Sequence, residues 1–227
     1  MACVLAYNEE KTIAEVIVRT IPHVDELIVV DDGSEDDTGI IAERLGALVV
    51  RHTQNLGKGV ALRHSLDMAK KRESDIVVTL DADGQHDPNE IPSLIRPVQM
   101  AEADIVIGSR IMNRKATQSM DLVTLASNSV VSHLLSARYG GDFTDVQTGY
   151  RVFSGAAVQR ILPHLCGTQF EIELEIICKA KLLGLILKEV PVTIHKRKGG
   201  RTKFTFLLRM RSLCFAFKYV LLLKRPH

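Results

Sequence analysis

The sequence predicts an α/β protein in which a mostly parallel central sheet is flanked by helices. Short apolar runs alternate with helical patterns through the first half of the chain, and turn residues bound each run. Polar residues gather directly after several of these runs. In a parallel sheet those positions form the carboxyl edge, where open α/β folds bind ligands.

The first half is expected to contribute five strands and the helices between them. The expected strands are residues 3–6, 27–30, 48–50, 76–80 and 105–107, and the expected helices are residues 10–20, 36–45, 57–71 and about 89–100. Apolar runs of this length that are separated by helices are typical of βαβ units.

The second half is expected to cover the first. It contains predicted helices at residues 121–138, 156–162 and 169–183, a strand at 150–153 and a strand pair around 186–194. Glu171, Glu173 and Glu175 alternate along the last helix, so at most two of them should face inward. Residues 1–203 show no linker and are predicted to form one domain.

Composition excludes several classes of protein. The chain has 227 residues, 46% of them hydrophobic, which is enough for a core that needs no metal or disulfide. The formal net charge of +2 is too balanced for a general nucleic-acid binder. Cys3, Cys166, Cys178 and Cys214 lie far apart among apolar residues and are interpreted as reduced core thiols.

The sharpest motif is a pair of aspartates after the apolar strand 76–80. Asp81 and Asp83 can aim two carboxylates at one hard cation, and Gln85 adds a neutral oxygen. A divalent ion held in this way can neutralise a diphosphate leaving group. The alternative is that both aspartates only form a turn or cap the next helix.

A second acidic pair, Asp31 and Asp32, follows the strand 27–30. A carboxylate fixed there can accept hydrogen bonds from base N–H groups or ribose hydroxyls. Asp32 is the predicted functional member of this pair.

Five segments resemble, in order, the motifs of family 2 inverting glycosyltransferases, most closely the dolichyl- or polyprenyl-phosphate mannose (or glucose) synthases. They are AYNEE at 6–10, VVDDGS at 29–34, NLGKG at 55–59, DADGQH at 81–86 and GSR at 108–110. DVQTGYR at 145–151 and KEVPV at 188–192, followed by Arg197, Gly200 and Lys203, resemble later segments of that family.

The resemblance implies a Rossmann-like GT-A fold, a GDP- or UDP-linked sugar donor and an Mg²⁺ or Mn²⁺ ion. It divides the domain into a nucleotide-sugar-binding half, residues 1–115, and an acceptor half, residues 116–203. The metal would be held by Asp81, Asp83 and Gln85. The donor site is assigned to Tyr7, Glu9, Val30, Asp32, Lys58, Asp81 and Ala82.

The resemblance also suggests the catalytic residues, which are Asp83, Arg110, Asp145, Arg197 and Lys203. Arg110 would face the reacting phosphates. Asp145 would orient the acceptor or act as a base, unless it only braces its loop by a hydrogen bond. Arg197 and Lys203 lie on a basic, glycine-containing loop that could close over phosphates, or could be a solvated turn.

The implied function is transfer of a hexose, mannose being favoured, to dolichyl or polyprenyl phosphate at the cytoplasmic membrane face. One alternative is a UDP-sugar-dependent transferase of glucose or N-acetylhexosamine with another acceptor. Another is a receiver-like phospho-signalling domain, since Asp31, Asp32, Asp81 and Ser109 resemble an acidic phosphorylation pocket. That pocket also needs a lysine after the next strand, and residues 116–178 contain none.

The last segment, residues 204–227, is strongly apolar but carries Arg209, Arg211 and Lys218. Burying these cations within a bilayer would cost several kcal/mol, so the segment is predicted to be an amphipathic helix on the membrane surface. The alternative is packing against the sheet or a second subunit. Neither a signal-peptide core nor a spanning segment is predicted, so the protein is expected in the cytoplasm, peripheral to the membrane.

Overall fold

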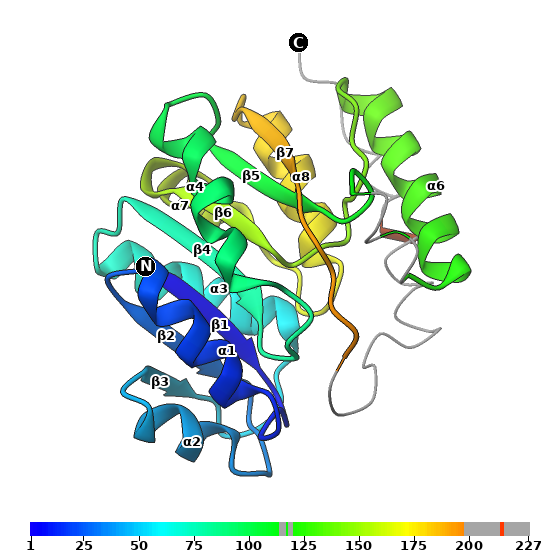
Figure 1. Cartoon of the computed structure of the whole chain (residues 1–227). Coiled ribbons are helices and arrows are strands. Elements are labelled where there is room, and N and C mark those ends of the chain that lie inside the picture. Colours follow the sequence, from blue (N-terminus) through cyan, green and yellow to red (C-terminus); the bar gives the residue numbers. More distant parts are fainter. Residues whose placement is uncertain (114–116, 118–119, 198–213, 216–227) are drawn as a thin grey trace.

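The computed structural model describes residues 1–113, 117, 120–197 and 214–215. It contains one seven-stranded sheet in the order β3-β2-β1-β4-β6-β5-β7 (Figure 1). Only β6 runs antiparallel to its neighbours. The predicted mostly parallel sheet is therefore confirmed. The strands are β1 (Ala2–Ala6), β2 (Leu27–Asp31), β3 (Leu48–Arg51), β4 (Ile76–Asp81), β5 (Ile105–Ser109), β6 (Arg151–Ser154) and β7 (Leu187–Pro191).

Helices cover both faces of the sheet. One face packs against α1 (Ile13–Thr20), α2 (Thr38–Arg44) and α4 (Ile91–Gln99). The other packs against α3 (Lys58–Lys71), α7 (Gly155–Ile161) and α8 (Ile172–Leu182). Helix α6 (Leu122–Tyr139) lies outside this layer, against α8. Three short 3-10 helices span Ile21–His23, Pro88–Glu90 and Leu162–His164.

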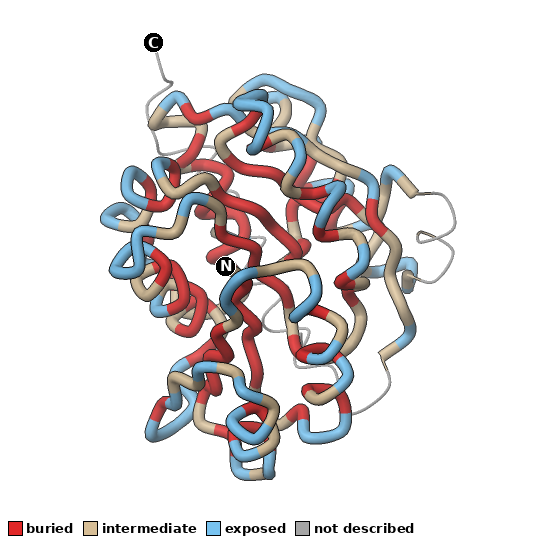
Figure 2. Tube along the Cα trace, turned by 60° about the vertical axis from the view of Figure 1, so that its left-hand side comes forward, coloured by how far each residue is buried: buried red, intermediate tan, exposed pale blue. Residues whose placement is uncertain are grey.

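Alternation along each strand divides the core into two apolar layers. In β2, Val29 packs with the α1 side and Val30 with the α3 side, because successive strand side chains point to opposite faces. Figure 2 shows the strands as a buried interior with exposed residues on the outer helix surfaces. The runs are apolar at nearly every position because both faces of the sheet are covered.

Two expectations about the second half are wrong. It does not only cover the first half, because β6 inserts between β4 and β5, and β7 pairs with β5. The expected strand pair around 186–194 is the single strand β7. After Pro191 the chain continues past β5, and the N–H of His195 donates to the Gln85 carbonyl at 2.9 Å. No turn residue reverses the chain at this point.

The expectation for the three alternating glutamates is also wrong, since all three are buried. Glu171 accepts the N–H groups of Thr168 and Gln169, and Glu175 accepts those of Cys166 and Gly167. The loop 166–169 therefore covers one side of α8. Glu173 points to the other side, where Lys58 meets it.

The cysteine prediction is half right. All four thiols are free, and Cys3 and Cys178 are buried in the core. Cys166 and Cys214 are exposed. Apolar sequence neighbours did not distinguish these two from core residues. At Cys166, for example, the adjacent Leu165 and Gly167 are buried while the cysteine itself is exposed.

Gly33 brings two loops at the carboxyl edge together. Its φ of +74° is a left-handed conformation, and a Cβ there would lie 2.4 Å from the backbone carbon of Gln54. The loop after β2 thus packs directly on the segment that follows β3.

We expect Gly33→Ala to destabilise the protein more than Gly46→Ala. Gly46 has a similar φ of +82° but no atom within 4 Å of its added Cβ. Gly46→Ala should cost only the left-handed strain of about 1–2 kcal/mol. Gly33→Ala should lose roughly 1–3 kcal/mol more because backbone must shift. Urea unfolding of both variants measures the difference, and equal losses would contradict the close approach.

Candidate functional site

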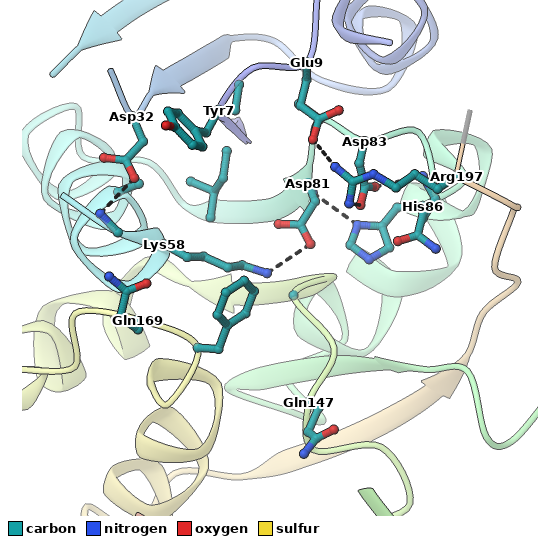
Figure 3. A pocket seen from close by; sticks show the side chains of 18 of the residues that line it. Tyr7, Glu9, Asp32, Lys58, Asp81, Asp83, His86, Gln147, Gln169 and Arg197 are labelled. Carbon is teal, nitrogen blue, oxygen red and sulfur yellow. Dashed lines mark hydrogen bonds and ion pairs between the residues drawn. The ribbon is translucent and has the colours of Figure 1, made fainter. Parts of the chain in front are cut away.

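A cleft of about 500 Å³ lies at the carboxyl edge of the sheet. Tyr7, Asp32 and Arg110 directly follow β1, β2 and β5, and Asp81 ends β4. Both halves of the chain line the cleft (Figure 3). It brings together most of the predicted site residues, namely Tyr7, Glu9, Asp32, Lys58, Asp81, Ala82, Asp83, Gln85, Arg110 and Arg197.

Asp32 lies at one end of the cleft, near Tyr7 (Figure 3). Its carboxylate accepts the N–H groups of Leu56 and Gly57, both at 2.9 Å, and His52 Nδ1 lies 2.7 Å from its Oδ1. A carboxylate offers about four acceptor positions, so three partners fix its orientation and leave room for a ligand donor.

Val30 does not belong to this site, which corrects its assignment to the donor pocket. Its side chain is fully buried and packs in the core layer on the α3 side. Neither Val30 nor Asp31, the last two residues of β2, lines the cleft, whereas the next residue, Asp32, does. Ala82 belongs both to the cleft and to the core, since it lines the cleft while its methyl group packs in the apolar layer on the α1 side.

The Asp81–Gln85 segment forms a closed turn at the centre of the cleft. Asp83 Oδ1 accepts the N–H of Gln85 at 3.0 Å, and His86 Nδ1 accepts the N–H of Asp81 at 3.1 Å. Burial lowers the pKa of His86, which keeps the ring neutral as this acceptor requires. His86 also stacks on Tyr150, so the turn rests on the sheet.

Each aspartate of the motif is paired with a cation. Asp81 Oδ2 lies 3.0 Å from Lys58 Nζ, and Asp83 Oδ2 lies 3.2 Å from Arg197 Nη1. Burial alone would raise the pKa of Asp81, but the Lys58 ammonium lowers it overall. Asp81 is therefore a carboxylate at neutral pH, as a metal ligand must be.

The donor set fits a divalent cation that arrives with its ligand. Within the described parts of the chain, no three His, Cys, Asp or Glu side chains gather into a metal-binding group. Asp81 and Asp83 offer carboxylates and Gln85 an amide oxygen, all on the cleft wall. Mg²⁺ is commonly held by one or two carboxylates, with substrate phosphates and water completing the shell.

Lys58, the first residue of α3, lies between two carboxylates. Its Nζ is 3.0 Å from both Asp81 Oδ2 and Glu173 Oε1. Burial would lower the pKa of Lys58, but the carboxylates raise it, so it stays charged. Gly149 leaves space for the ammonium, since a Cβ there would lie 2.7 Å from Nζ. The resemblance assigned Lys58 to the donor site but did not indicate its two carboxylate partners.

Glu173 supports the cleft through Lys58 and was not assigned by sequence reasoning. It is almost fully buried, and burial raises its pKa despite the Lys58 partner. A carboxylate between the apolar residues Ile172 and Leu174 was the available signal. Helical spacing alone could not show that it faces Lys58, because the two lie on different helices.

Arg110, which lines the cleft, forms a bidentate ion pair with Asp145. Arg110 Nε and Nη2 donate to Asp145 at 2.6 and 2.8 Å, and the Arg110 N–H donates at 3.0 Å. Asp145 is fully buried, so its expected contact with an acceptor is corrected. It acts through Arg110, in line with the bracing alternative, and Arg110 lines the cleft.

The loop that carries Asp145 is fastened from two strands. Glu189 of β7 accepts the N–H groups of Thr144 and Asp145. The buried Arg151 of β6 donates to the carbonyls of Val146, Thr148 and Glu173. Burial lowers the pKa of Arg151 to about 10.

The segment 192–197, which follows β7, runs to the cleft, where Ile194 and Arg197 line the wall. The Arg197 guanidinium contacts Glu9 as well as Asp83, and thereby joins two acidic residues of the cleft (Figure 3). Thr193 is tied to Glu90, and His195 to Gln85, just before it. Lys203, expected on the same loop, lies outside the described residues.

The arrangement agrees with the sequence comparison. The family profile described as Glycosyl transferase family 2 matches residues 1–162, which is more than half of the chain. The chain belongs to glycosyl transferase family 2.

Two relatives of this glycosyl transferase carry prenyl-linked names. The UDP-N-acetylglucosamine–dolichyl-phosphate N-acetylglucosaminyltransferase of Methanococcus voltae is 35% identical over 205 residues, 82% of each chain. The polyprenol monophosphomannose synthase of Mycolicibacterium smegmatis is 28% identical over 209 residues, which are 88% of this chain and 78% of the relative.

A solved structure confirms the GT-A fold of this family 2 member. It is the glucosyl-3-phosphoglycerate synthase of Mycobacterium tuberculosis in complex with Mn²⁺, UDP and glucosyl-3-phosphoglycerate. The TM-score is 0.74 at 25% identity, over 96% of this chain and 78% of that chain. The same enzyme was also solved with Mg²⁺ and UDP. The receiver-like alternative is wrong, because the family match excludes it.

We expect Asp145→Asn to destabilise this glycosyl transferase by about 3 kcal/mol, because it leaves the largely buried Arg110 without its charge partner. Lys188→Met is the control, since it removes the exposed Lys188–Glu102 pair and should leave the stability almost unchanged. Urea unfolding compares the two. Equal, small losses would show that the Arg110–Asp145 pair does not hold the loop.

Proposed function

We propose that this protein transfers a sugar from a nucleoside diphosphate sugar to a polyprenyl or dolichyl phosphate, with Mg²⁺ or Mn²⁺ bound at the aspartate motif. The observation that carries the proposal is that one cleft gathers three kinds of group. Asp32 lies beside Tyr7, Asp81 lies between Asp32 and Asp83 in the view of Figure 3, and the braced Arg110 lines the same cleft. The two prenyl-phosphate relatives and the UDP-bound neighbour support it.

The Asp32 end suits the nucleoside. Asp32 retains an acceptor position for a base N–H or a ribose hydroxyl, and Tyr7 and Glu9 line the same wall. Asp32 accepts from uracil or guanine alike, so the UDP or GDP choice rests on other groups of the pocket.

The centre of the cleft suits the diphosphate. Asp81, Asp83 and Gln85 would hold the cation, which supplies charge neutralisation to the leaving nucleoside diphosphate. Lys58 lies directly beside Asp81 and adds a second positive charge there. Arg197 is placed to move from the carboxylates of Glu9 and Asp83 to the phosphates when they arrive.

The Arg110 end suits the phosphate of the acceptor. A phosphate monoester is already ionised near neutral pH, so its oxygen attacks the anomeric carbon without a general base. The new carbon–oxygen bond forms as the bond to the diphosphate breaks, and a single displacement inverts the anomeric centre. Arg110 orients the attacking phosphate, and Asp145 holds Arg110 in place.

The proposal also covers the sugar that is transferred and the place where the enzyme works. Mannose stays the favoured sugar, while N-acetylglucosamine is the sugar in the name of the Methanococcus voltae relative. We place the enzyme at the cytoplasmic membrane face, with residues 204–227, which except for 214–215 lie outside the described residues, as its amphipathic contact. Among the described residues, no helix has the length and apolar character to cross a bilayer.

The proposed function is tested by a panel of GDP- and UDP-linked sugars with Mn²⁺ and three acceptors, namely a polyprenyl phosphate in detergent, the corresponding prenol and 3-phosphoglycerate. We expect transfer to the polyprenyl phosphate alone, detected as a radiolabelled lipid product. Transfer to the prenol would contradict a phosphate nucleophile. Transfer only to phosphoglycerate would replace the lipid acceptor in the proposal.

We expect Asp83→Ala to abolish transfer, and excess EDTA to do the same to the wild type, because the diphosphate leaving group loses its cation. The fold should survive, since Asp83 lies at the sheet edge and contributes little to the core. Asp67→Ala, which removes a half-exposed carboxylate of α3, is the control and should keep its activity. Full activity of Asp83→Ala, or of the wild type in EDTA, would remove the metal from the proposal.

A further inference from the structure

Two histidines connect the Asp32 carboxylate to the outer surface of α3. His52, directly after β3, is buried, and its Nδ1 lies 2.7 Å from Asp32 Oδ1. Its Nε2 lies 2.8 Å from Nδ1 of His64, which is exposed on α3. The two rings meet edge to face with centroids 4.8 Å apart. A hydrogen-bonded chain therefore runs from the cleft wall to solvent.

The partners determine where the protons lie. A carboxylate only accepts, so His52 carries its proton on Nδ1 and, when neutral, accepts on Nε2. His64 must then donate from Nδ1, which leaves its own Nε2 free to take a proton. One extra proton can enter there and pass to His52 without movement of heavy atoms. A second is excluded, because two N–H groups would then face each other.

We propose that His52 is a positioning residue that holds Asp32 for the nucleoside of the donor, and that protonation of the His52–His64 pair weakens donor binding. The proposal rests on the proposed function, in which Asp32 contacts the base or ribose. A carboxylate beside a neutral imidazole keeps its full negative charge for a ligand donor. Beside an imidazolium, much of that charge is already matched by an ion pair.

The groups around the pair set the pH range of this effect. On α3, Arg63 and Lys71 disfavour a further proton on His64, and Asp67 favours one. Burial, followed by His52 and Arg63, lowers the pKa of His64 below its usual 6.5. On the cleft side, Asp32 faces His52. Proton uptake by His64 is therefore centred below its usual pKa of 6.5, so the affinity for the donor weakens as the pH falls through that range.

The test separates the hydrogen bond from the proton. His52→Asn places an amide N–H where Nδ1 donates, and His52→Leu removes the donor at similar volume. His64→Phe keeps the aromatic contact without a titrating group, and His133→Phe, on the exposed side of α6, is the matched control. Binding of UDP and GDP with Mn²⁺ is measured by calorimetry at about pH 8 and about pH 5.5. The titration of the nucleotide itself is common to all variants and cancels in the ratios.

We expect His52→Leu to weaken nucleotide binding about tenfold at the higher pH, and to raise KM for the donor more than it lowers kcat. His52→Asn should bind several-fold more tightly than His52→Leu. His64→Phe should lose most of the pH dependence that His133→Phe retains.

Wild-type affinity in a folded His52→Leu, or a full pH dependence in His64→Phe, would overturn the inference while the proposed function stands. If the wild type binds neither UDP nor GDP, the proposed function fails and the inference with it. If His52→Leu does not fold, the pH dependence of nucleotide binding in His52→Asn and His64→Phe decides the matter. Its loss in both variants supports the inference, and its retention in both overturns it.

Discussion

The cleft depends on carboxylates that are paired with cations from distant parts of the chain. Lys58 reaches Asp81 from α3, and Arg197 reaches Asp83 from the segment after β7. Charges in a partly buried cleft are costly without partners, so each pair fixes the relative position of two elements. The same ion pairs therefore position the side chains of the site and hold the loops at the carboxyl edge together.

The pairs differ in how readily they can be exchanged for ligand contacts. Arg110–Asp145 is bidentate, and Asp145 is fully buried and further tied to Glu189 through its N–H, so it is a permanent support. Arg197 keeps 20% of its side chain exposed and contacts two carboxylates, Glu9 and Asp83. A diphosphate with its cation can offer Arg197 and the Asp83 carboxylate new partners of opposite charge. The cleft thus combines a rigid ion pair at Arg110 with ion pairs at Asp83 whose charges are free to regroup.

The sequence alone predicted the strands and the polar residues that follow them, because both depend on residues that are close together in the chain. The apolar runs located the strands, and residues such as Asp32 and Asp81 reached the cleft because they follow strands whose ends share one edge. Glu173 and His52 could not be assigned, since their roles depend on partners that sequence spacing does not relate. Val30 was misplaced for the opposite reason. The motif match included it, but strand alternation turns its side chain into the core.

The antiparallel strand β6 lies between β4 and β5 and joins the β3-β2-β1-β4 part of the sheet to β5 and β7. The chain leaves the sheet after β5, forms α6 and the Asp145 loop, and returns between β4 and β5. Most of the chain around Arg110 is thus a single excursion between the neighbouring strands β5 and β6, and Glu189 of β7 braces it from outside. Such an excursion can be lengthened, shortened or replaced while the register of the sheet is kept. A change confined to this segment would therefore alter the surroundings of Arg110 and leave Asp32 and its partners after β2 and β3 in place.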